Sequence, residues 1–272
     1  MWYFIHFMTS ERMSLFKKQA LFFFFVLLLS ESIFLAQIPR LNIEGSYLLK
    51  TAWGGTAPLN AFIPENDALG CHAVAFAQVL YFHRLAPHGK VAYQCSNGSI
   101  ISEDFSDYLP KWDKFILDGD SAIESAESAR ETSRFLYYVA SIIRKDFGTD
   151  QYVDYPNDFH KKAIESHFDC KVTAYSRKVT PNISSALRED PDIPTLLQAE
   201  VDSNRPAGFY YTNRKGSGHA VVIDGYTIKD EKTYFHVNFG WFGRSDGWYL
   251  LEEDLPRDTV EIALIMIEPT NE

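Results

Sequence analysis

The sequence has few cysteines, no excess of positive charge and no internal repeat. Its three cysteines are an odd number, so at least one thiol is left unpaired. Neither a C-x-x-C nor an H-x-x-x-H pair occurs, so the common zinc-binding spacings are missing, and we predict no cofactor. The chain carries 26 Lys and Arg residues against 36 Asp and Glu residues. Because it has no basic tract, nucleic acid is not an expected partner.

Long apolar runs are also lacking, except for one near the N-terminus. Residues 20–29 are unbroken apolar sequence, with two lysines just before them and small residues after them. This pattern predicts a secretory signal peptide over residues 1–36, with Met13 as a second candidate for the start. The run is shorter than the ~20 residues that span a bilayer comfortably. We therefore expect a secreted, periplasmic or cell-surface protein that touches a membrane only if the signal segment stays uncleaved.

The remaining residues, 37–272, suit one large domain or two packed lobes. From residue 71 to about residue 85 the chain lacks Gly and Pro and is mostly apolar, which favours a buried helix. A second helix is expected over residues 121–148, because its apolar residues keep helical spacing and Ser121 and Glu124 form a capping box. Two shorter helices are expected over residues 158–167 and in the stretch "NISSALRED".

After Pro194 the pattern changes to short β-rich runs separated by turn residues. Helices therefore come before strands along the chain. That segregation predicts an α+β fold with an antiparallel sheet and argues against alternating βαβ units. The runs are "PTLLQAEV", "AGFYYTN", "HAVVIDGYTI", "KTYFHVNFG", "GWYLLEE" and "EIALIMIEP".

Cys71 opens the first expected helix, directly after Gly70. Unpaired backbone N–H groups and the helix dipole at that position favour a thiolate and would lower the pKa of the cysteine. The glycine permits a tight turn and close approach of a substrate. Free cysteine is also among the most buried residue types, so from this helix alone a structural thiol is an equal alternative.

A nucleophilic cysteine needs a base, which is usually histidine. Of the eight histidines, His219 is the best placed, because it begins a β run just after a glycine-flanked loop. Asn238 is a candidate to orient the base through a hydrogen bond, as the third group of a triad. Trp241 is a candidate to shield that bond from water. His236 lies two residues before Asn238, in an expected strand of alternating pattern, and it fits a packed or an exposed position equally well.

Four segments, in order, resemble motifs of the streptopain family of cysteine peptidases, which are papain-like in fold. "LLKTAWGGTAPLN" is similar to that family's W-x-Q-x-x-P-Y-N segment, and "GCHAVAFAQVLYFH" to its G-C-V-A-x-A-x-A-Q-I-M-x-Y-H helix. "EVDSNRPAGFYYTNRKGSGHAVVIDGY" resembles its E-L-x-x-G-R-P-V … G-G-H-A-F-V-I-D-G-Y stretch. "HVNFGWFGRSDGWYLL" resembles its H-V-N-W-G-W-G-G-x-S-D-G-Y-F segment. The resemblance covers roughly residues 46–250, and four ordered motifs are far more specific than one.

The resemblance implies a two-lobe fold, with a helical N-terminal lobe that carries the cysteine helix and a β-rich C-terminal lobe. It implies that Cys71 is the nucleophile and His219 the general base and acid, that Asn238 orients the imidazole and that Trp241 lines the site. The thiolate would attack a peptide carbonyl, the imidazole would protonate the leaving amine, and water would hydrolyse the thioester. The expected function is that of an exported cysteine endopeptidase with a protein or peptide substrate.

The chain also departs from the resembled pattern beside the nucleophile. The family's glutamine, which helps to form the oxyanion hole, aligns with Gly55. Loss of one oxyanion donor costs ~10²–10³ in turnover. The backbone N–H of Cys71 would remain, and Thr56 and Asn60 are candidates to reach in. A catalytically weak or silent homologue that binds peptide or protein in the cleft is therefore one alternative function, and a Cys–His cell-wall amidase is another.

Three further departures concern the shape of the cleft. His72 stands where the family has a small apolar residue, Phe239 replaces a tryptophan and Phe242 replaces a glycine. Streptopain-like zymogens also carry a sizeable propeptide, but only about ten residues separate the expected cleavage point from "SYLLKTAWGG". We expect no such propeptide within residues 37–272, and a separate inhibitor protein is one way to restrain the activity.

Several other residues have a structural interpretation that we prefer. A zinc site from Cys71, His72 and His83 fits poorly, because adjacent helix residues point about 100° apart. Asp224 could serve as a triad acid, but a structural turn is favoured. Cys95 and Cys170 either pair with each other or stay as two independent buried thiols, and the sequence leaves both alternatives open.

Overall fold

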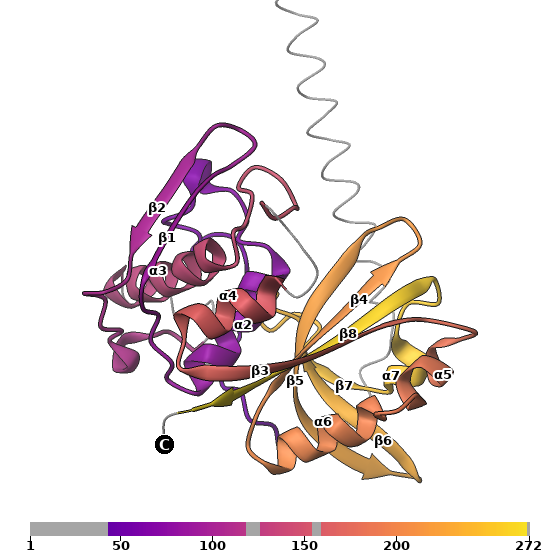
Figure 1. Ribbon diagram of the computed structural model, residues 1–272. Coiled ribbons are helices and arrows are strands. Elements are labelled where there is room, and N and C mark those ends of the chain that lie inside the picture. The colour runs from indigo at the N-terminus through magenta and orange to yellow at the C-terminus, as the bar shows by residue number, and fades with distance from the viewer. Residues whose placement is uncertain (1–42, 118–125, 154–158, 271–272) are drawn as a thin grey trace, which may run out of the picture. The chain divides into compact units, whose positions relative to one another are not determined.

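The computed structural model describes residues 43–117, 126–153 and 159–270, which belong to one compact unit, Asn42–Glu272 (Figure 1). The expected signal peptide and the expected capping box of Ser121 and Glu124 lie outside the described residues. Within those ranges, no helix combines the length and the apolar character needed to cross a membrane.

The first half of the unit is built around helix α2, which begins at Cys71 as the sequence predicts and ends at Phe82, a few residues before the expected end near residue 85. Ten of its residues are buried, because apolar residues occupy nearly its whole circumference. It packs against α3 on one side and against strand β5 on the other (Figure 1). The elements of this half are η1 (Pro64–Asn66), α2 (Cys71–Phe82), β1 (Lys90–Gln94), β2 (Ile100–Asp104), η2 (Trp112–Lys114), α3 (Ala126–Ile142) and α4 (Phe159–His167).

The second half is a six-stranded antiparallel sheet in the order β3-β8-β4-β5-β6-β7. A strand with one covered face alternates buried and exposed residues, whereas a strand with both faces covered is buried continuously. The central strand β5 is of the second kind, because its middle is continuously buried. The elements are β3 (Cys170–Lys178), α5 (Ile183–Arg188), α6 (Ile193–Asp202), β4 (Ala207–Asn213), β5 (Gly218–Lys229), β6 (Lys232–Asn238), β7 (Gly247–Tyr249), α7 (Leu251–Asp254) and β8 (Thr259–Pro269).

The predicted α+β class with an antiparallel sheet is confirmed, but the strict order of helices before strands is wrong. The run "PTLLQAEV" is helix α6, because Asp192 caps it by accepting a hydrogen bond from the Thr195 N–H and a proline lies in its first turn. Strands β1 and β2 pair as a hairpin in the helical half, and β3 pairs with the C-terminal strand β8. Strands β1, β2 and β3 are not predicted from the sequence.

The cysteines other than Cys71 are two separate buried thiols. Cys95 follows strand β1, and its sulfur lies 3.9 Å from the carbonyl oxygen of Lys145. Cys170 begins strand β3 and is also free. Of the two alternatives that the sequence left open, the structure therefore has the unpaired one.

Asp224 has a structural role, as the sequence indicates, but it lies within strand β5, where the pairing with β6 shifts register, and not in a turn. Its carboxylate is fully buried and accepts hydrogen bonds from the Leu49 N–H, at 2.9 Å, and from Nδ1 of His236, at 2.7 Å. The Tyr47 ring stacks on the His236 imidazole, with centroids 3.9 Å apart. This cluster ties the segment before the site to strands β5 and β6, so His236 is a packed residue and not a second base at the thiol.

Candidate active site

Cys71 lies at the first position of helix α2, where Gly70 adopts a left-handed backbone with φ of 83°. A Cβ atom at residue 70 would come within 3.1 Å of Cε of the buried Lys145, so only glycine fits this turn without a shift. The side chain of Cys71 is half-buried. The turn thus sets the thiol at the N-terminal end of the helix, as the sequence predicts.

Burial raises the pKa of the Cys71 thiol above its usual range, and backbone N–H groups of Ala220, His72 and Cys71 itself act in the opposite direction. The helix terminus lowers the pKa, as the sequence predicts, but the desolvation that outweighs this effect depends on packing. The resting protein is therefore expected to hold a neutral thiol. The bond from Ala220 also places the sulfur beside the residue that follows His219 in strand β5.

His219 is the second residue of strand β5 and directly precedes Ala220, whose backbone N–H bonds the Cys71 sulfur. Its Nε2 atom lies 2.9 Å from the carbonyl oxygen of Phe239. Because a carbonyl only accepts, Nε2 carries the proton of the neutral imidazole and Nδ1 is left as the basic atom. Burial lowers the pKa of His219 to about 4. The imidazole is therefore a neutral base at ordinary pH.

Trp241 covers the imidazole of His219, with ring centroids 4.6 Å apart. Phe239 lies nearly parallel to the same imidazole at 6.1 Å. Trp241 also forms a backbone bridge with Gly54, which connects the loop after strand β6 to the segment before α2. The two aromatic rings keep water from one side of the base.

Asn238 lies one residue before the carbonyl that contacts the imidazole, and its amide has other partners. Its Oδ1 accepts from Nε2 of Gln78 at 3.0 Å and from the Gly240 N–H at 3.0 Å. Its Nδ2 donates to the Thr51 carbonyl at 2.7 Å. The predicted direct bond from Asn238 to the imidazole is replaced by the neighbouring backbone carbonyl, so the asparagine fixes the turn that presents this carbonyl.

Gln78 is a site residue that the sequence analysis missed. It is fully buried in α2, where its Oε1 accepts from the Thr51 hydroxyl at 2.9 Å and its Nε2 donates to Asn238. It lies seven residues after Cys71, on the same face of the helix. A glutamine in an otherwise apolar helix at that spacing was a usable signal, because a buried amide needs partners.

The position of the missing glutamine lies beside the first turn of α2. A Cβ atom on Gly55 would be 3.7 Å from the Gly70 nitrogen and 3.6 Å from Cγ2 of Val74. Asn60, one candidate to replace the glutamine, instead donates its Nδ2 protons to the carbonyls of Asn66 and Asp67, at 2.7 and 3.1 Å. Thr56, the other candidate, is exposed.

His72 directly follows Cys71 and is buried. Its Nδ1 lies 3.8 Å from the Cys71 sulfur, and its ring centroid is 4.6 Å from Tyr210 and 4.8 Å from His160. Burial, then the charges of His160 and His219, lower the pKa of His72 well below its usual value. In the part of the chain that the structure describes, no group of three metal-binding side chains could hold an ion.

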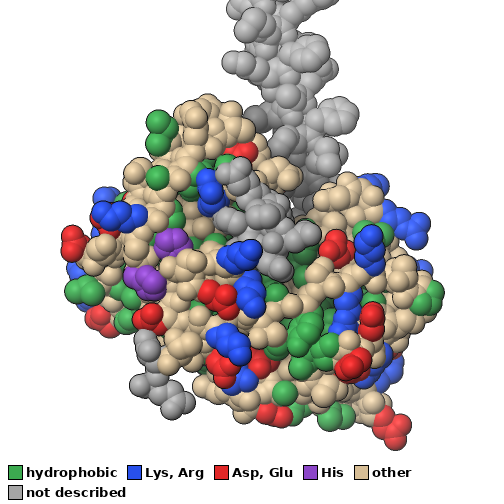
Figure 2. All heavy atoms as spheres, in the orientation of Figure 1, with side chains coloured by type: hydrophobic (Ala, Val, Ile, Leu, Met, Phe, Trp, Pro, Cys, Tyr) green, Lys and Arg blue, Asp and Glu red, His purple; other side chains and the backbone are tan. Residues whose placement is uncertain are grey.

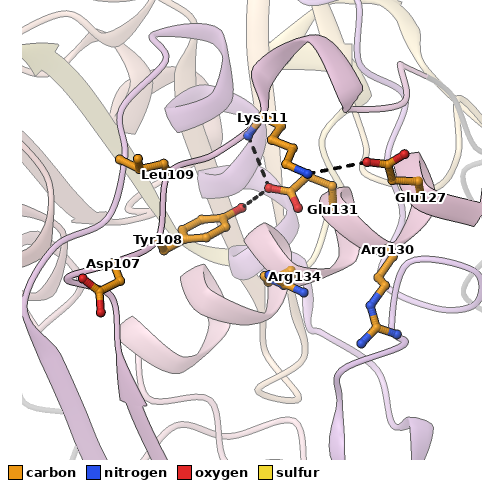
Figure 3. Close-up of a pocket in the computed structure, with 8 residues that line it drawn as sticks. All are labelled: Asp107, Tyr108, Leu109, Lys111, Glu127, Arg130, Glu131 and Arg134. Atoms are coloured by element: carbon orange, nitrogen blue, oxygen red, sulfur yellow. Dashed lines mark hydrogen bonds and ion pairs between the residues drawn. The ribbon is translucent and has the colours of Figure 1, made fainter.

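A surface hollow of about 290 Å³ lies away from Cys71, on the helical half (Figure 3). Glu131 accepts hydrogen bonds there from the Tyr108 hydroxyl and the Lys111 N–H, and Lys111 pairs with Glu127. Figure 2 likewise shows acidic and basic side chains interspersed over one face of the molecule. The lining residues are Asp107, Tyr108, Leu109, Lys111, Glu127, Arg130, Glu131 and Arg134.

Comparison with known families agrees with this geometry. The model of the Peptidase C10 family matches residues 53–249, a range that includes the thiol, the imidazole and the loop after β6. The chain belongs to this family. The streptopain resemblance in the sequence is thereby confirmed, and the C10 family is one of cysteine peptidases.

Individual relatives are distant. Streptopain from Streptococcus pyogenes is 26% identical over 201 residues, which are 71% of this chain and 48% of that protein. The thiol protease/hemagglutinin PrtT of Porphyromonas gingivalis is 25% identical over 214 residues, 73% of this chain and 23% of that protein. The chain therefore spans about half the length of the streptopains that it matches.

The fold is that of a solved papain-like member. Active interpain A, a cysteine protease of Prevotella intermedia, superposes with a TM-score of 0.65 at 20% identity, over 81% of this chain and 93% of that one. A prointerpain A fragment superposes with a TM-score of 0.61 over 81% of this chain and 71% of that one. The predicted papain-like α+β fold is thus confirmed.

Proposed function

We propose that this protein is a cysteine endopeptidase whose nucleophile is Cys71 and whose base is His219. The observation that carries the proposal is the junction of α2 and β5. There the thiol at the helix start is hydrogen-bonded by the backbone of Ala220, the residue directly after His219, and a carbonyl holds Nε2 of the His219 imidazole. Membership of the C10 family supports the same assignment.

In the proposed reaction the thiol proton of Cys71 moves to Nδ1 of His219 as the sulfur attacks the scissile carbonyl carbon. The C–N bond of the peptide then breaks, and the same proton passes to the leaving amine, which leaves a thioester on the sulfur. Water, deprotonated by the imidazole, attacks the thioester, and the carboxylic acid departs as the thiol is restored. Asn238 acts by fixing the turn that presents the Phe239 carbonyl to the imidazole, and Trp241 acts by shielding the imidazole.

The oxyanion of the tetrahedral intermediate would receive a hydrogen bond from the Cys71 backbone N–H. Gly55 supplies no side-chain donor, and Asn60 is engaged with the carbonyls of its own loop. One absent donor typically costs ~10²–10³ in turnover. We therefore infer a slow enzyme, and a silent homologue that binds peptide in the same cleft is the second candidate, which Gly55 favours.

Labelling with a thiol-reactive peptidyl epoxide at pH 7 tests the proposal. We expect Cys71 alone to react, because the other two thiols are buried and burial raises the pKa of Cys170 to about 12. The His219→Ala variant should lose the reaction while it keeps its fold. Absence of labelling in the folded protein would favour the binding homologue. Cleavage of a cell-wall peptide amide, with no cleavage of unfolded protein, would favour an amidase.

The proposal also includes export of the enzyme and inhibition of its activity before it reaches its substrate. The apolar segment at residues 20–29 supports secretion to the periplasm, the cell surface or the medium. N-terminal sequencing of the exported protein would test cleavage near residue 36. The partners that we infer are a protein or peptide substrate and a separate inhibitor protein.

A further inference from the structure

Phe242 has a backbone conformation that is unusual for an aromatic residue. Its φ of 54° lies in the left-handed region, which glycine and asparagine enter far more readily. Non-glycine residues held in this region cluster at ligand-binding and catalytic sites, where the surrounding structure overrides the local preference. Phe242 directly follows Trp241, the residue that covers the His219 imidazole.

The ring of Phe242 is fixed against the segment that precedes the nucleophile. A Cβ atom on Gly54 would lie 2.3 Å from the nearest Phe242 ring carbon, so the ring occupies the space that any side chain at residue 54 would need. The Phe242 N–H donates to the Trp53 carbonyl at 3.2 Å. The side chains of Phe242 and Trp241 are nevertheless only half-buried, so both present apolar surface outward.

The chemistry of the reaction says which part of a substrate meets this surface. The leaving amine takes its proton from His219, so the residue after the scissile bond must pass beside that imidazole. The Trp241 ring, 4.6 Å from the imidazole, borders this path, and Phe242 extends the border towards Gly54. An apolar side chain would bury its surface there, whereas a charged one would lose water without gaining a partner.

We propose that Phe242, together with Trp241, forms the subsite for the residue on the leaving-group side of the scissile bond and selects apolar side chains there. Phe242 is the specificity-determining member, because its ring fills a place that a smaller residue would leave open. The inference rests on the proposed peptidase function and adds to it the class of peptide bond that is cleaved.

Acyl transfer from a peptide methyl ester tests the inference directly. Methanol leaves the subsite empty, so added amino-acid amides compete with water for the acyl-enzyme according to how well they bind there. We expect phenylalaninamide to outcompete glycinamide in the wild type. Phe242→Gly should lower that ratio about ten-fold, the usual scale for apolar pocket contacts, without a matching loss of ester consumption. Leu109→Asn removes an exposed apolar side chain elsewhere and should change nothing.

The results separate the inference from the function on which it rests. An unchanged amide ratio in Phe242→Gly, with a normal acyl-enzyme, would overturn the subsite while the peptidase stands. Failure to form any acyl-enzyme would overturn both. Should Phe242→Gly not fold, Phe242→Asn tolerates the left-handed backbone and should also lower the ratio. The wild type alone gives a further check, because cleavage of an unfolded protein mixture should show apolar residues directly after the cut.

Discussion

A Cβ atom on Gly55 would lie 3.7 Å from the backbone nitrogen of Gly70, at ordinary contact distance. The same atom would touch Cγ2 of Val74, three residues after the nucleophile. Residue 55 therefore has room for a side chain and adjoins the turn that sets Cys71 in place. In the proposed oxyanion hole, the missing donor is therefore a matter of which side chain stands at residue 55. The backbone of residue 55 already lies close enough to the turn before Cys71.

Gly55→Gln should raise kcat/KM for a fluorogenic peptide at least ten-fold, because an added amide donor restores part of the ~10²–10³ that one oxyanion donor supplies. Steady-state kinetics of the purified variant measure the gain, and thermal unfolding verifies that the fold is kept. Gly55→Leu is the matched control, since it adds similar bulk without a donor. A leucine variant as fast as the glutamine variant would mean that packing and not hydrogen bonding is responsible.

The pH dependence of kcat/KM should reflect the buried base. The pKa of His219 is lowered to about 4 by burial, so its neutral form persists until the pH falls through that value. We expect activity to hold down to about pH 5, to halve near pH 4 and to fall about ten-fold for each pH unit below that. A decline centred near pH 6.5 would contradict the burial of the imidazole. Samples returned to pH 6.5 after each measurement control for unfolding in acid.

Asn238→Ala and Gln78→Ala should lower kcat by similar factors, about ten- to a hundred-fold. Both variants disturb one network that holds the turn carrying the Phe239 carbonyl, and a displaced base costs rate steeply. Both should also destabilise the protein by about 1–3 kcal/mol, because a buried amide partner is lost. Chemical unfolding and kinetics on the same samples measure the two effects. A large kcat loss in Asn238→Ala alone would indicate that the asparagine acts on the imidazole directly.

His160→Phe should make the protein less sensitive to acid. Burial lowers the pKa of His160 from 6.5 to about 4, so the unfolded chain binds more protons than the folded one between these values. Stability therefore falls as the pH falls through this window, by ~2 kcal/mol at pH 5 from this residue. Urea unfolding at pH 7 and pH 5 should show a smaller difference in the variant. Leu109→Asn, at an exposed residue that does not titrate, should keep the wild-type difference.

Elements with a strong local pattern were predictable from the sequence. Helix α2 was expected from residue 71 because no glycine or proline interrupts it, and it begins at Cys71. Strand β3 was missed, because its alternation is half polar and its partner β8 lies about ninety residues later in the chain. The β-rich pattern after Pro194 predicts a strand where helix α6 lies, although the buried residues Ile193 and Leu197 keep helical spacing after an aspartate cap.

The site was predictable in its residue types but not in its hydrogen bonds. Motif order predicts that Cys71, His219 and the loop after β6 belong to one site. Which atom contacts the imidazole depends on the path of the backbone after Asn238, and a left-handed glycine at residue 240 sets that path. Whether the pKa of Cys71 is raised or lowered depends on how much of the fold encloses the thiol. This is a property of packing, which the spacing of residues in the sequence does not encode.

The partner of the base is a backbone atom, and this affects how the site tolerates mutation. A side-chain orienter is lost with one codon change, whereas every residue that could replace Phe239 still brings a carbonyl oxygen. Substitution at residue 239 is thus free to alter the aromatic wall without removing the acceptor for Nε2. Mutations that change the shape of the cleft at residue 239 therefore leave the tautomer of the histidine unchanged. Related proteins can then diverge in substrate preference before they lose the proposed base.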